Sequence, residues 1–362
     1  MPGPIFLLKG KFMPPKQIRK TFEGKTVIVT GSNTGVGYAT ALKYVQLAAS
    51  TVILGVRSLQ KGEMAKSQIE TATGRTGVVQ VWQVDMGSFE SIDAFAKRVE
   101  SLKRVDVAVL NAGIFPRTFK LSEKGWESNL QVNTLGTALL AILLAPKLQA
   151  SRTADSPAHL VVVTSTGHMD VQLKPQDKDQ LLHKYNNDLG VGPYQQHVAS
   201  KLFMMWITRE LAHRCLNGKG EPTVIINDAC PGACRSDVAR DFDTPLFTIA
   251  KRIGSFLAMR PAENGARVLV GASALGEDSN GRWRSADGTY APPGEFITSD
   301  EGKILQNAMW TEVVGVLEQK IPRVKDVIAS VLQFAFMTEI RPFMDAKLTA
   351  MLFVAEEQEY QK

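Results

Sequence analysis

Three glycines within residues 25–37, KTVIVTGSNTGVG, have the types and spacing that most directly suggest chemistry. Val27–Val29 is an apolar run typical of a buried strand, and the residues after Gly37 repeat with helical spacing. A strand, a tight turn and a helix aim free backbone N–H groups and the positive end of a helix at one point. Gly31, Gly35 and Gly37 lack the Cβ atoms that would block this turn and the approach of a phosphate. The stretch therefore predicts a phosphate-binding turn.

The glycine spacing, TGxxxGxG, resembles the short-chain dehydrogenase/reductase family and differs from the longer GxGxxG fingerprint. The resemblance covers about residues 21–315, and other family positions match in order. It implies a nicotinamide cofactor. The implied cofactor-binding residues are the turn residues Gly31, Ser32, Asn33, Gly35, Val36 and Gly37; Asp85 at the adenine; Asn111, Ala112 and Gly113 at the ribose; Lys201; and Pro231, Gly232 and Ser236 at the nicotinamide, where Ser236 replaces the family's threonine.

The end of the predicted second strand indicates which cofactor is preferred. A site specific for NAD usually has an acidic residue there, which binds the ribose 2′-hydroxyl. This strand ends in Val56-Arg57-Ser58, with no acid. A guanidinium can pair with a 2′-phosphate, and Ser32 and Asn33 are placed to add hydrogen bonds. We expect NADP(H); the alternative is that Arg57 is an ordinary surface arginine.

The resemblance also implies a catalytic set. Three members match: Asn133 would hold a water of the proton relay, Ser165 would position the substrate oxygen, and Lys201 would hold the ribose and tune its neighbour. The fourth departs from the family. The pattern YxxxK reads His197-Val-Ala-Ser-Lys201 here, so that a histidine stands where the family has the proton-transferring tyrosine.

This substitution changes the proton chemistry. Residues four apart share a helix face, so His197 should lie beside Lys201. Imidazole has an ordinary pKa near 6.5, and a lysine ammonium should lower it further because like charges repel. Neutral imidazole is a base or hydrogen-bond donor and offers little imidazolium as an acid. Imidazole is also shorter than phenol, so the substrate must approach closer or a water must bridge. The alternative is a decayed site without catalysis.

Two other side chains are open candidates. Tyr194 lies one helical turn before His197 and two turns before Lys201. Its Cα should then be about 10 Å from that of Lys201, which argues against direct tuning of the phenol. His168 follows Ser165 in the segment STGH and is either a pocket residue or, more often at such positions, a structural histidine.

The elements that must position these residues alternate along the chain. This order predicts a Rossmann-like α/β fold, a doubly wound parallel sheet with helices on both faces. A polar segment, 169–193, interrupts the rhythm and should lie at the mouth of the site. The predicted strands are 27–29, 51–56, 78–84, 105–110, 159–164 and 223–227, and the predicted helices include 38–47, 61–71, 89–103 and 130–148.

Composition narrows the class of protein. The 362 residues carry a net charge of +6, with 44% hydrophobic residues. Lys and Arg are scattered, which argues against a nucleic-acid partner. Cys215, Cys230 and Cys234 are too few and too irregular for a disulfide framework or a metal site, so a reducing, cytoplasmic location is expected. The apolar patch in residues 1–16 is too short for a signal peptide or a membrane span.

We divide the chain into an N-terminal arm (1–20), a Rossmann-fold cofactor and substrate domain (21–302) and a helical C-terminal extension (303–362). In the extension, Val327–Met337 is uncharged but about half the length of a bilayer span. We expect these helices to pack on the core or across a homodimer interface. A lid over an apolar substrate and attachment to a membrane surface are the alternatives.

Three functions remain open at this stage. The first is an NADP(H)-dependent reductase or dehydrogenase acting on a carbonyl or alcohol, in which His197 replaces the tyrosine as proton donor, with a water held near Asn133. The second is a redox-neutral isomerase, cyclase or lyase with His197 as base, and the third is a nucleotide-binding protein without catalysis. The segments FLLKGKF and TSDEGK are similar to fungal family members of secondary metabolism, which implies a bulky apolar substrate.

Overall fold

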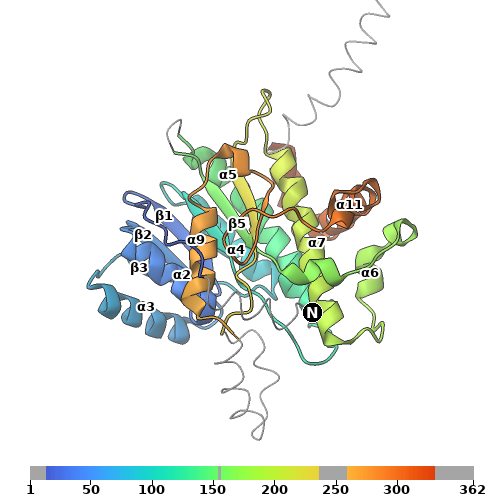
Figure 1. Ribbon diagram of the computed structural model, residues 1–362, viewed down its shortest axis with the longest axis horizontal. Coiled ribbons are helices and arrows are strands. Elements are labelled where there is room, and N and C mark those ends of the chain that lie inside the picture. Colours follow the sequence, from blue (N-terminus) through green and yellow to red (C-terminus); the bar gives the residue numbers. More distant parts are fainter. Residues whose placement is uncertain (1–13, 154–155, 236–258, 331–362) are drawn as a thin grey trace, which may run out of the picture.

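A single parallel sheet organises the protein in the computed structural model, which describes residues 14–153, 156–235 and 259–330. Within these residues, seven strands lie in the order β3-β2-β1-β4-β5-β6-β7 (Figure 1). The order reverses between β1 and β4, and sheets of this kind bind ligands beside the carboxyl ends of the strands at such a reversal. The bounds are β1 Thr26–Thr30, β2 Thr51–Val56, β3 Val79–Gln83, β4 Val107–Leu110, β5 His159–Val163, β6 Ile225–Ala229 and β7 Trp283–Arg284.

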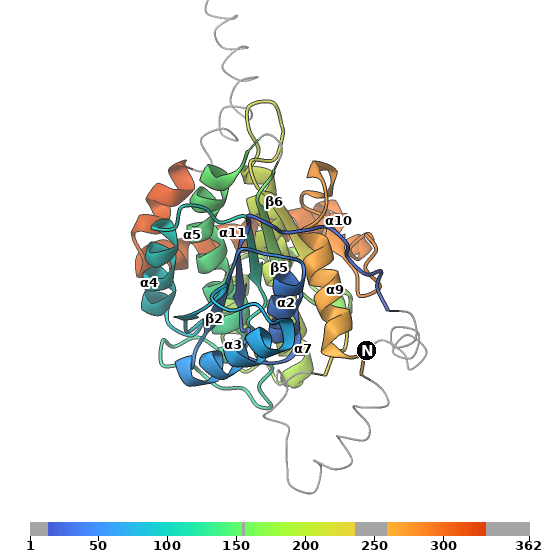
Figure 2. The same ribbon diagram turned by 90° about the vertical axis from the view of Figure 1, so that its left-hand side faces the viewer.

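Helices cover both faces of the sheet, as Figures 1 and 2 show. Strand residues alternate between two hydrophobic clusters: Val27 and Val29 pack with one set of helices, and Ile28 packs with the other. The doubly wound fold predicted from the sequence is confirmed. The first set is α2 (Gly35–Gln46), α3 (Leu59–Thr73) and α9 (Ala262–Ala272), and the second is α4 (Phe89–Glu100), α5 (Thr137–Ser151) and α7 (Gly192–Arg214).

The helix that ends in α5 begins with a wider turn. The sequence predicts an α-helix over 130–148, but residues Leu130–Gly136 form a π-helix, η1, before α5. Such wide turns are rare and occur often at functional sites. Asn133 lies inside this one. The π-helix is therefore a local feature that the apolar periodicity of the segment does not reveal.

The stretch Leu130–Ser151 is long and apolar enough to cross a membrane by length and composition, since an 18-residue window within it has a mean hydropathy of 1.3. In the protein, 78% of that window is buried. It packs between α4 and α7 as part of the hydrophobic cluster on that face of the sheet. A buried helix of a large core is apolar on all sides for this reason.

The polar segment 169–193 contains the short helices η3 (Pro175–Lys178) and α6 (Leu181–Tyr185), after η2 (Thr166–Asp170). A C-terminal helix, α11 (Asp300–Lys320), preceded by α10 (Glu295–Thr298), holds it in place. Both carboxylate oxygens of Glu312 accept from α6, from the backbone N–H groups of Leu181 (2.7 Å) and Leu182 (3.0 Å). The segment TSDEGK begins α11, where the Ser299 hydroxyl accepts from the Gly302 N–H at 3.0 Å.

The ends of the described chain also contact the core. Arg267 on α9 donates to the Pro15 carbonyl at 3.2 Å, and Arg323 pairs with Asp93 of α4. The three-part division at residues 20 and 302 stays a prediction. The predicted arm before residue 14 and the tail from residue 331 lie outside the described residues.

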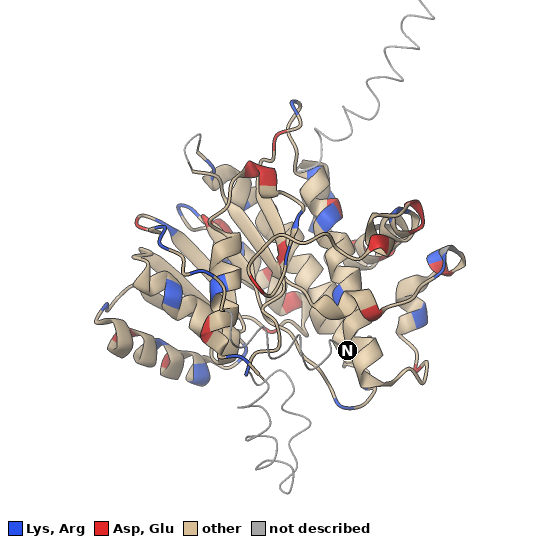
Figure 3. Ribbon diagram, in the orientation of Figure 1, with Lys and Arg blue, Asp and Glu red and all other residues tan. Residues whose placement is uncertain are grey.

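Most predicted elements agree with the observed ones, with shifts at their ends. The sixth strand covers residues 225–229 rather than 223–227. β7 was not predicted, because a two-residue strand carries no periodicity. Figure 3 shows Lys and Arg dispersed among Asp and Glu over the described ribbon, as the sequence suggests.

Candidate active site

The predicted phosphate-binding turn connects β1 to α2. Gly31 and Gly35 have φ angles of +64° and +58°, the left-handed conformation that favours glycine. A Cβ on Gly37 would lie 2.3 Å from the Gly31 carbonyl oxygen and 2.5 Å from Asn111 Nδ2. All three glycines are therefore required by the geometry of the turn itself.

The turn has the features expected of an anion site. The first turn of α2 contains no acidic residue, and the Thr34 side chain does not cap it. The Ser32 hydroxyl is buried and makes no hydrogen bond within the described residues. Backbone N–H groups at the start of a helix are not satisfied by the helix itself. Ser32, Asn33 and the Gly35–Gly37 backbone thus fit a phosphate group.

Asn111 joins the turn to the neighbouring strand. Its Nδ2 donates to the carbonyl oxygens of Thr30 (3.0 Å) and Gly31 (3.3 Å). The Thr30 hydroxyl in return accepts from the backbone N–H groups of Asn111 (3.0 Å) and Ala112 (3.1 Å). The carboxyl ends of β1 and β4 are thereby fixed side by side, at the reversal of strand order.

Two predicted cofactor residues lie at the ends of the next strands. Arg57 follows β2 and is exposed, and its carbonyl oxygen accepts from Gln83 Nε2 at 3.4 Å. Its guanidinium has no hydrogen bond or ion pair with any described residue. Asp85 follows β3, and its Oδ1 accepts from the Gly87 N–H at 2.9 Å. The Arg57 backbone and the Asp85 carboxylate are thus engaged within the protein, while the Arg57 guanidinium is available to a ligand.

In the other half of the sheet, beyond β4 and β5, Pro231-Gly232 follows β6. Gly232 has a φ of +77°, and a Cβ there would lie 2.7 Å from Arg260 Nη1. Arg260 is buried, and Nη1 donates to the Pro231 carbonyl at 3.3 Å. Close packing of Arg260 against this turn therefore explains the glycine. Arg260 was not among the predicted site residues. The predicted residue Ser236 lies outside the described residues.

The Ser165 segment begins where β5 ends. The Ser165 hydroxyl accepts from the Gly167 N–H at 3.1 Å and so caps η2. His168 is buried, and its Nδ1 donates to the Ser165 carbonyl at 2.6 Å. His168 Nε2 accepts from the Gly294 N–H at 3.4 Å. With both nitrogens engaged, His168 acts as a structural support for the Ser165 segment.

His197 and Asn133 meet at one backbone carbonyl. The Ile114 carbonyl oxygen accepts from Asn133 Nδ2 at 3.0 Å and from His197 Nδ1 at 3.1 Å. His197 Nδ1 also faces Asn129 Oδ1 at 3.3 Å. Carbonyl oxygens only accept, so Nδ1 carries the proton of the neutral ring. Nε2 is then the nitrogen with a free lone pair.

Burial, with the Lys201 ammonium as the second cause, lowers the pKa of His197 to about 3. The predicted direction is the same, but burial is the larger cause and was not predicted. Burial also lowers the pKa of Lys201 to about 8. Lys201 Nζ donates to the Val163 carbonyl at 2.9 Å. His197 is therefore neutral at pH 7, and Lys201 is close to its own titration.

Asn133 and Lys201 converge beside Gly113, where a Cβ would lie 3.1 Å from Asn133 Oδ1 and 3.3 Å from Lys201 Nζ. His197 makes no hydrogen bond to Ser165 within the described residues; its ring instead lies 4.6 Å from the Phe115 ring. The structure thus brings together Gly113, Asn133, His197 and Lys201. The segment that begins at Ser165 contacts α7 elsewhere, through Gly167.

Tyr194 has a different environment from the one the family's tyrosine needs. Its hydroxyl donates to the Asp170 carboxylate, which together with burial raises the pKa of Tyr194 to about 12. A Cβ on Gly167 would lie 3.2 Å from this hydroxyl. Tyr194 therefore lies beside the Ser165 segment. Its hydroxyl is a weak acid, and its proton is already donated to Asp170.

Sequence reasoning missed the residues that fix His197. Asn129 lies four residues before Asn133, a spacing that places both on one helix face and was a usable signal. The Ile114 carbonyl carries no side-chain signal at all. The Ser200 hydroxyl, which accepts from Asn133 Nδ2 at 3.1 Å and donates to the His197 carbonyl at 2.7 Å, completes the set.

Comparison with known proteins agrees with this geometry. The family model described as short chain dehydrogenase matches residues 25–173. The short-chain dehydrogenase/reductase phmF of Phaeosphaeria nodorum is 41% identical over 323 residues, covering 88% of this chain and 94% of the relative. The chain is a member of the short-chain dehydrogenase/reductase family. The resemblance seen in the sequence is confirmed, and this short-chain dehydrogenase/reductase is an enzyme of a family of oxidoreductases.

Solved structures share the fold of this short-chain dehydrogenase/reductase. An uncharacterised protein from Mycobacterium paratuberculosis matches with a TM-score of 0.59 and 25% identity, covering 83% of this chain and 95% of that one. A short chain dehydrogenase from Shigella flexneri, solved in complex with NADP, matches with a TM-score of 0.53 and 22% identity, covering 74% and 99%.

Proposed function

We propose that this enzyme is an NADP(H)-linked oxidoreductase that interconverts an alcohol and a carbonyl on a bulky apolar molecule. A bound nicotinamide supplies or takes up the hydride in such reactions. The chain's own residues bind the cofactor, orient the substrate oxygen and move its proton.

One observation carries the proton assignment: the Ile114 carbonyl holds the proton of His197 on Nδ1. Nε2 then takes a proton from a substrate hydroxyl as general base and returns it in the reverse direction. Because the pKa of His197 is lowered to about 3, the base form is the resting state throughout the physiological range. In the direction of alcohol oxidation, the resting enzyme therefore already has the proton acceptor in its unprotonated form.

The supporting residues have proposed roles. Lys201, adjacent to Gly113 and Asn133, binds the ribose and keeps the imidazole neutral through its positive charge. Asn133 fixes the Ile114 carbonyl and thereby the imidazole tautomer. Ser165 orients the substrate oxygen from the end of β5.

Preference for NADP(H) rests on Arg57. It is exposed at the end of β2, where no acidic residue competes for the ribose, and its guanidinium has no partner among the described residues. A guanidinium binds a phosphate with charge-assisted, bidentate hydrogen bonds. The structural relative from Shigella flexneri was solved with NADP. Ser32 and Asn33 stay proposed partners of the same phosphate.

A bulky apolar substrate is supported by the surroundings of the imidazole. The Phe115 ring lies 4.6 Å from the His197 ring and presents an apolar wall beside the proposed base. The segment TSDEGK, which suggested this substrate class by resemblance, begins α11, and α11 holds α6 and the polar segment after Ser165. The proposed homodimer and cytoplasmic location stay predictions.

The His197 tautomer also supports a second function, a redox-neutral isomerase, cyclase or lyase, because an unprotonated Nε2 is a base for any acidic substrate proton. The two functions differ in whether hydride moves.

The test incubates the enzyme with NADP⁺ and a bulky secondary alcohol, 1-tetralol deuterated at the carbinol carbon, and follows deuterium into the cofactor by mass spectrometry. The oxidoreductase assignment expects deuterated NADPH from the parent and a loss of about a hundredfold or more in His197→Ala. His197→Tyr restores the family's phenol beside Lys201 and should retain hydride transfer. Absence of deuterium transfer in both the parent and His197→Tyr contradicts the assignment and favours the redox-neutral one.

A further inference from the structure

We propose that a groove between α7 and the β7–α10 connection binds a small organic anion, a carboxylate or phosphate ester with an apolar body. The groove has a volume of about 440 Å³. This is within the usual range for small-molecule sites. Its wall includes Arg209 and Arg282, Trp283 and Tyr290, and Pro292 and Pro293. In Figure 1 the β7–α10 connection crosses beside α7.

The positive charge of the groove is not cancelled by its neighbours. Arg209 and Arg282 form no ion pair within 4.0 Å with a described carboxylate. Glu210, the acid next to Arg209 on α7, is engaged elsewhere: it accepts from Arg214 Nε at 3.1 Å and from Gln306 Nε2 at 2.7 Å. Two arginines therefore line one groove with no described carboxylate within 4.0 Å of either guanidinium.

The buried carboxyl of Asp228 interacts with Arg209 from beyond 4.0 Å. It lies on β6, next to Trp283 of β7 in the sheet. Burial raises the pKa of Asp228 well above its usual range, which makes it a weak counter-ion. The two arginines that line the groove carry hydrogen-bond donors and no acceptor in their side chains, which suits an acceptor ligand.

Most of the remaining lining residues are apolar. Pro292 and Pro293 form one side, and the Tyr290 ring lies 5.8 Å from the Arg282 guanidinium. An anion with an apolar body would pair its charge with the arginines and pack its body on the prolines. A bare inorganic ion would use only the first of these contacts.

The groove is separate from the phosphate-binding turn, which lies between β1 and α2. Its wall nevertheless connects with the catalytic region. The Trp283 ring meets the His168 ring edge-on at 5.0 Å, and His168 Nδ1 donates to the Ser165 carbonyl at 2.6 Å. Two contacts therefore connect Trp283 to Ser165, the first through the His168 ring and the second through the Ser165 carbonyl. A ligand bound against Trp283 is expected to affect the Ser165 segment through these contacts.

Phenyl phosphate is the probe, titrated calorimetrically into the enzyme with the cofactor turn saturated by NADPH. We expect binding at one site by the parent and none of comparable strength by benzyl alcohol, its neutral counterpart. Loss of a hydrogen bond to a charged group typically weakens binding by roughly ten- to a hundredfold. The double variant Arg209→Gln, Arg282→Gln should show a loss of at least this size.

Arg214→Gln is the matched control, because Arg214 lies on the same helix but is paired with Glu210 and stacked over Trp310. It should bind as the parent does. Arg282→Gln alone, at an exposed position, guards against misfolding of the double variant and should weaken binding by itself. No binding by the parent, equal binding of benzyl alcohol, or unchanged binding in the double variant overturns the proposal.

Discussion

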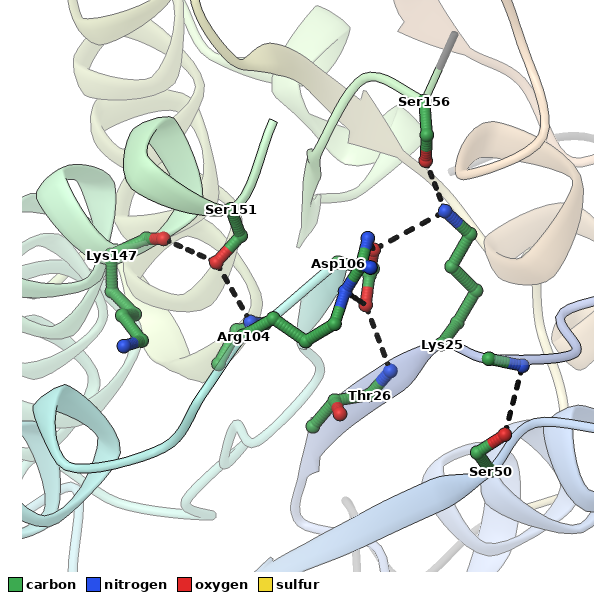
Figure 4. Close-up of polar contacts among 10 residues, drawn as sticks. Lys25, Thr26, Ser50, Arg104, Asp106, Lys147, Ser151 and Ser156 are labelled. Carbon is green, nitrogen blue, oxygen red and sulfur yellow. Dashed lines mark hydrogen bonds and ion pairs between the residues drawn. The ribbon is translucent and has the colours of Figure 1, made fainter. Parts of the chain in front are cut away.

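The amino ends of the parallel strands form one edge of the sheet, the amino edge, and their carboxyl ends form the other, the carboxyl edge. These two edges use buried polar groups in opposite ways. At the amino edge, the buried carboxylate of Asp106 is fully engaged (Figure 4). It accepts from Arg104 Nε at 2.9 Å, from the Thr26 N–H at 2.9 Å and from Lys25 Nζ at 3.3 Å. The Lys25 ammonium in turn bonds the Ser156 hydroxyl. Charges at this edge are satisfied by one another.

At the carboxyl edge, comparable groups are fixed by hydrogen bonds but keep donors or acceptors that the described residues do not engage. His197 donates through Nδ1 and keeps a lone pair on Nε2, and the Ser32 hydroxyl has no partner among the described residues. Lys201 donates to one carbonyl and has a lowered pKa. On the proposed function, the amino edge contributes to stability, and the carboxyl edge keeps hydrogen-bonding capacity for the cofactor and substrate.

Two histidines sharpen the contrast. Burial lowers the pKa of His159, at the amino edge, to about 3, as it does for His197 at the carboxyl edge. The lowered pKa is therefore no sign of catalysis by itself. What distinguishes His197 is its position beside Lys201, Asn133 and the glycine turn.

The largest expected effect comes from replacing His197 with alanine, with the same replacement of His159 as the control. His197→Ala should lower kcat/KM by about a hundred- to ten-thousandfold, because it removes the proposed base. Cofactor affinity, measured by NADPH fluorescence, should stay nearly constant. His159→Ala, the matched control at the other edge, should reduce stability and leave kcat/KM of the folded fraction unchanged. Equal kinetic losses in both variants would break the comparison.

Asp106→Ala tests the stabilising edge. Removing one partner of a buried charge set typically costs about 3–5 kcal/mol in free energy of unfolding, because the remaining charges lose their counter-ion. Lys25 and Arg104 are partly exposed, so the lower end is expected. Urea denaturation measures the loss, and NADPH titration of the folded protein should show no change. A loss below about 1 kcal/mol would mean that the pairs contribute little.

Gly37→Ala tests whether the carboxyl edge is shaped for an anion. The added Cβ would lie 2.3 Å from the Gly31 carbonyl oxygen, so the turn must shift. Overpacking of this kind costs about 1–3 kcal/mol, which as lost affinity is roughly a five- to hundredfold rise in the Kd of NADPH. Gly24→Ala, in open space before β1, is the control for an exposed turn glycine. Unchanged NADPH affinity in Gly37→Ala would contradict the phosphate assignment.

Arg57→Ala should act on one cofactor only. Loss of an exposed guanidinium–phosphate pair should raise the Kd of NADPH by roughly three- to tenfold, since solvent screens the contact. The Kd of NADH should not change, because NADH lacks the 2′-phosphate. Fluorescence titration of both cofactors checks this. Equal losses for NADPH and NADH, or tighter NADH binding by the parent, would refute the preference.

The smallest effect is in the pH profile of kcat/KM. Because the pKa of His197 is lowered to about 3, its base form persists down to that pH, and no inflection is expected at pH 6–7. Because the pKa of Lys201 is lowered to about 8, its charge is present below pH 8 and lost above it, which should halve activity near pH 8. An acid limb near pH 6.5 would show that the imidazole is not held neutral by burial.

The sequence alone determined much of the carboxyl edge. The glycine spacing, the apolar runs of the strands and the position of Lys201 after His197 are local patterns, and they predicted the fold, the tight glycine turn between β1 and α2 and the shared helix face. They succeed because strand burial, turn conformation and helix periodicity depend on residues close together in the chain.

Only the tertiary structure decided how those residues act. The tautomer of His197 follows from the Ile114 carbonyl, 83 residues away in the chain, and the structural role of His168 follows from Gly294, 126 residues away. The pairing of Asp106 with Lys25 likewise joins residues 81 apart. Hydrogen-bond direction and burial are properties of packed neighbours, so a backbone carbonyl that fixes a proton leaves no trace in residue type or spacing.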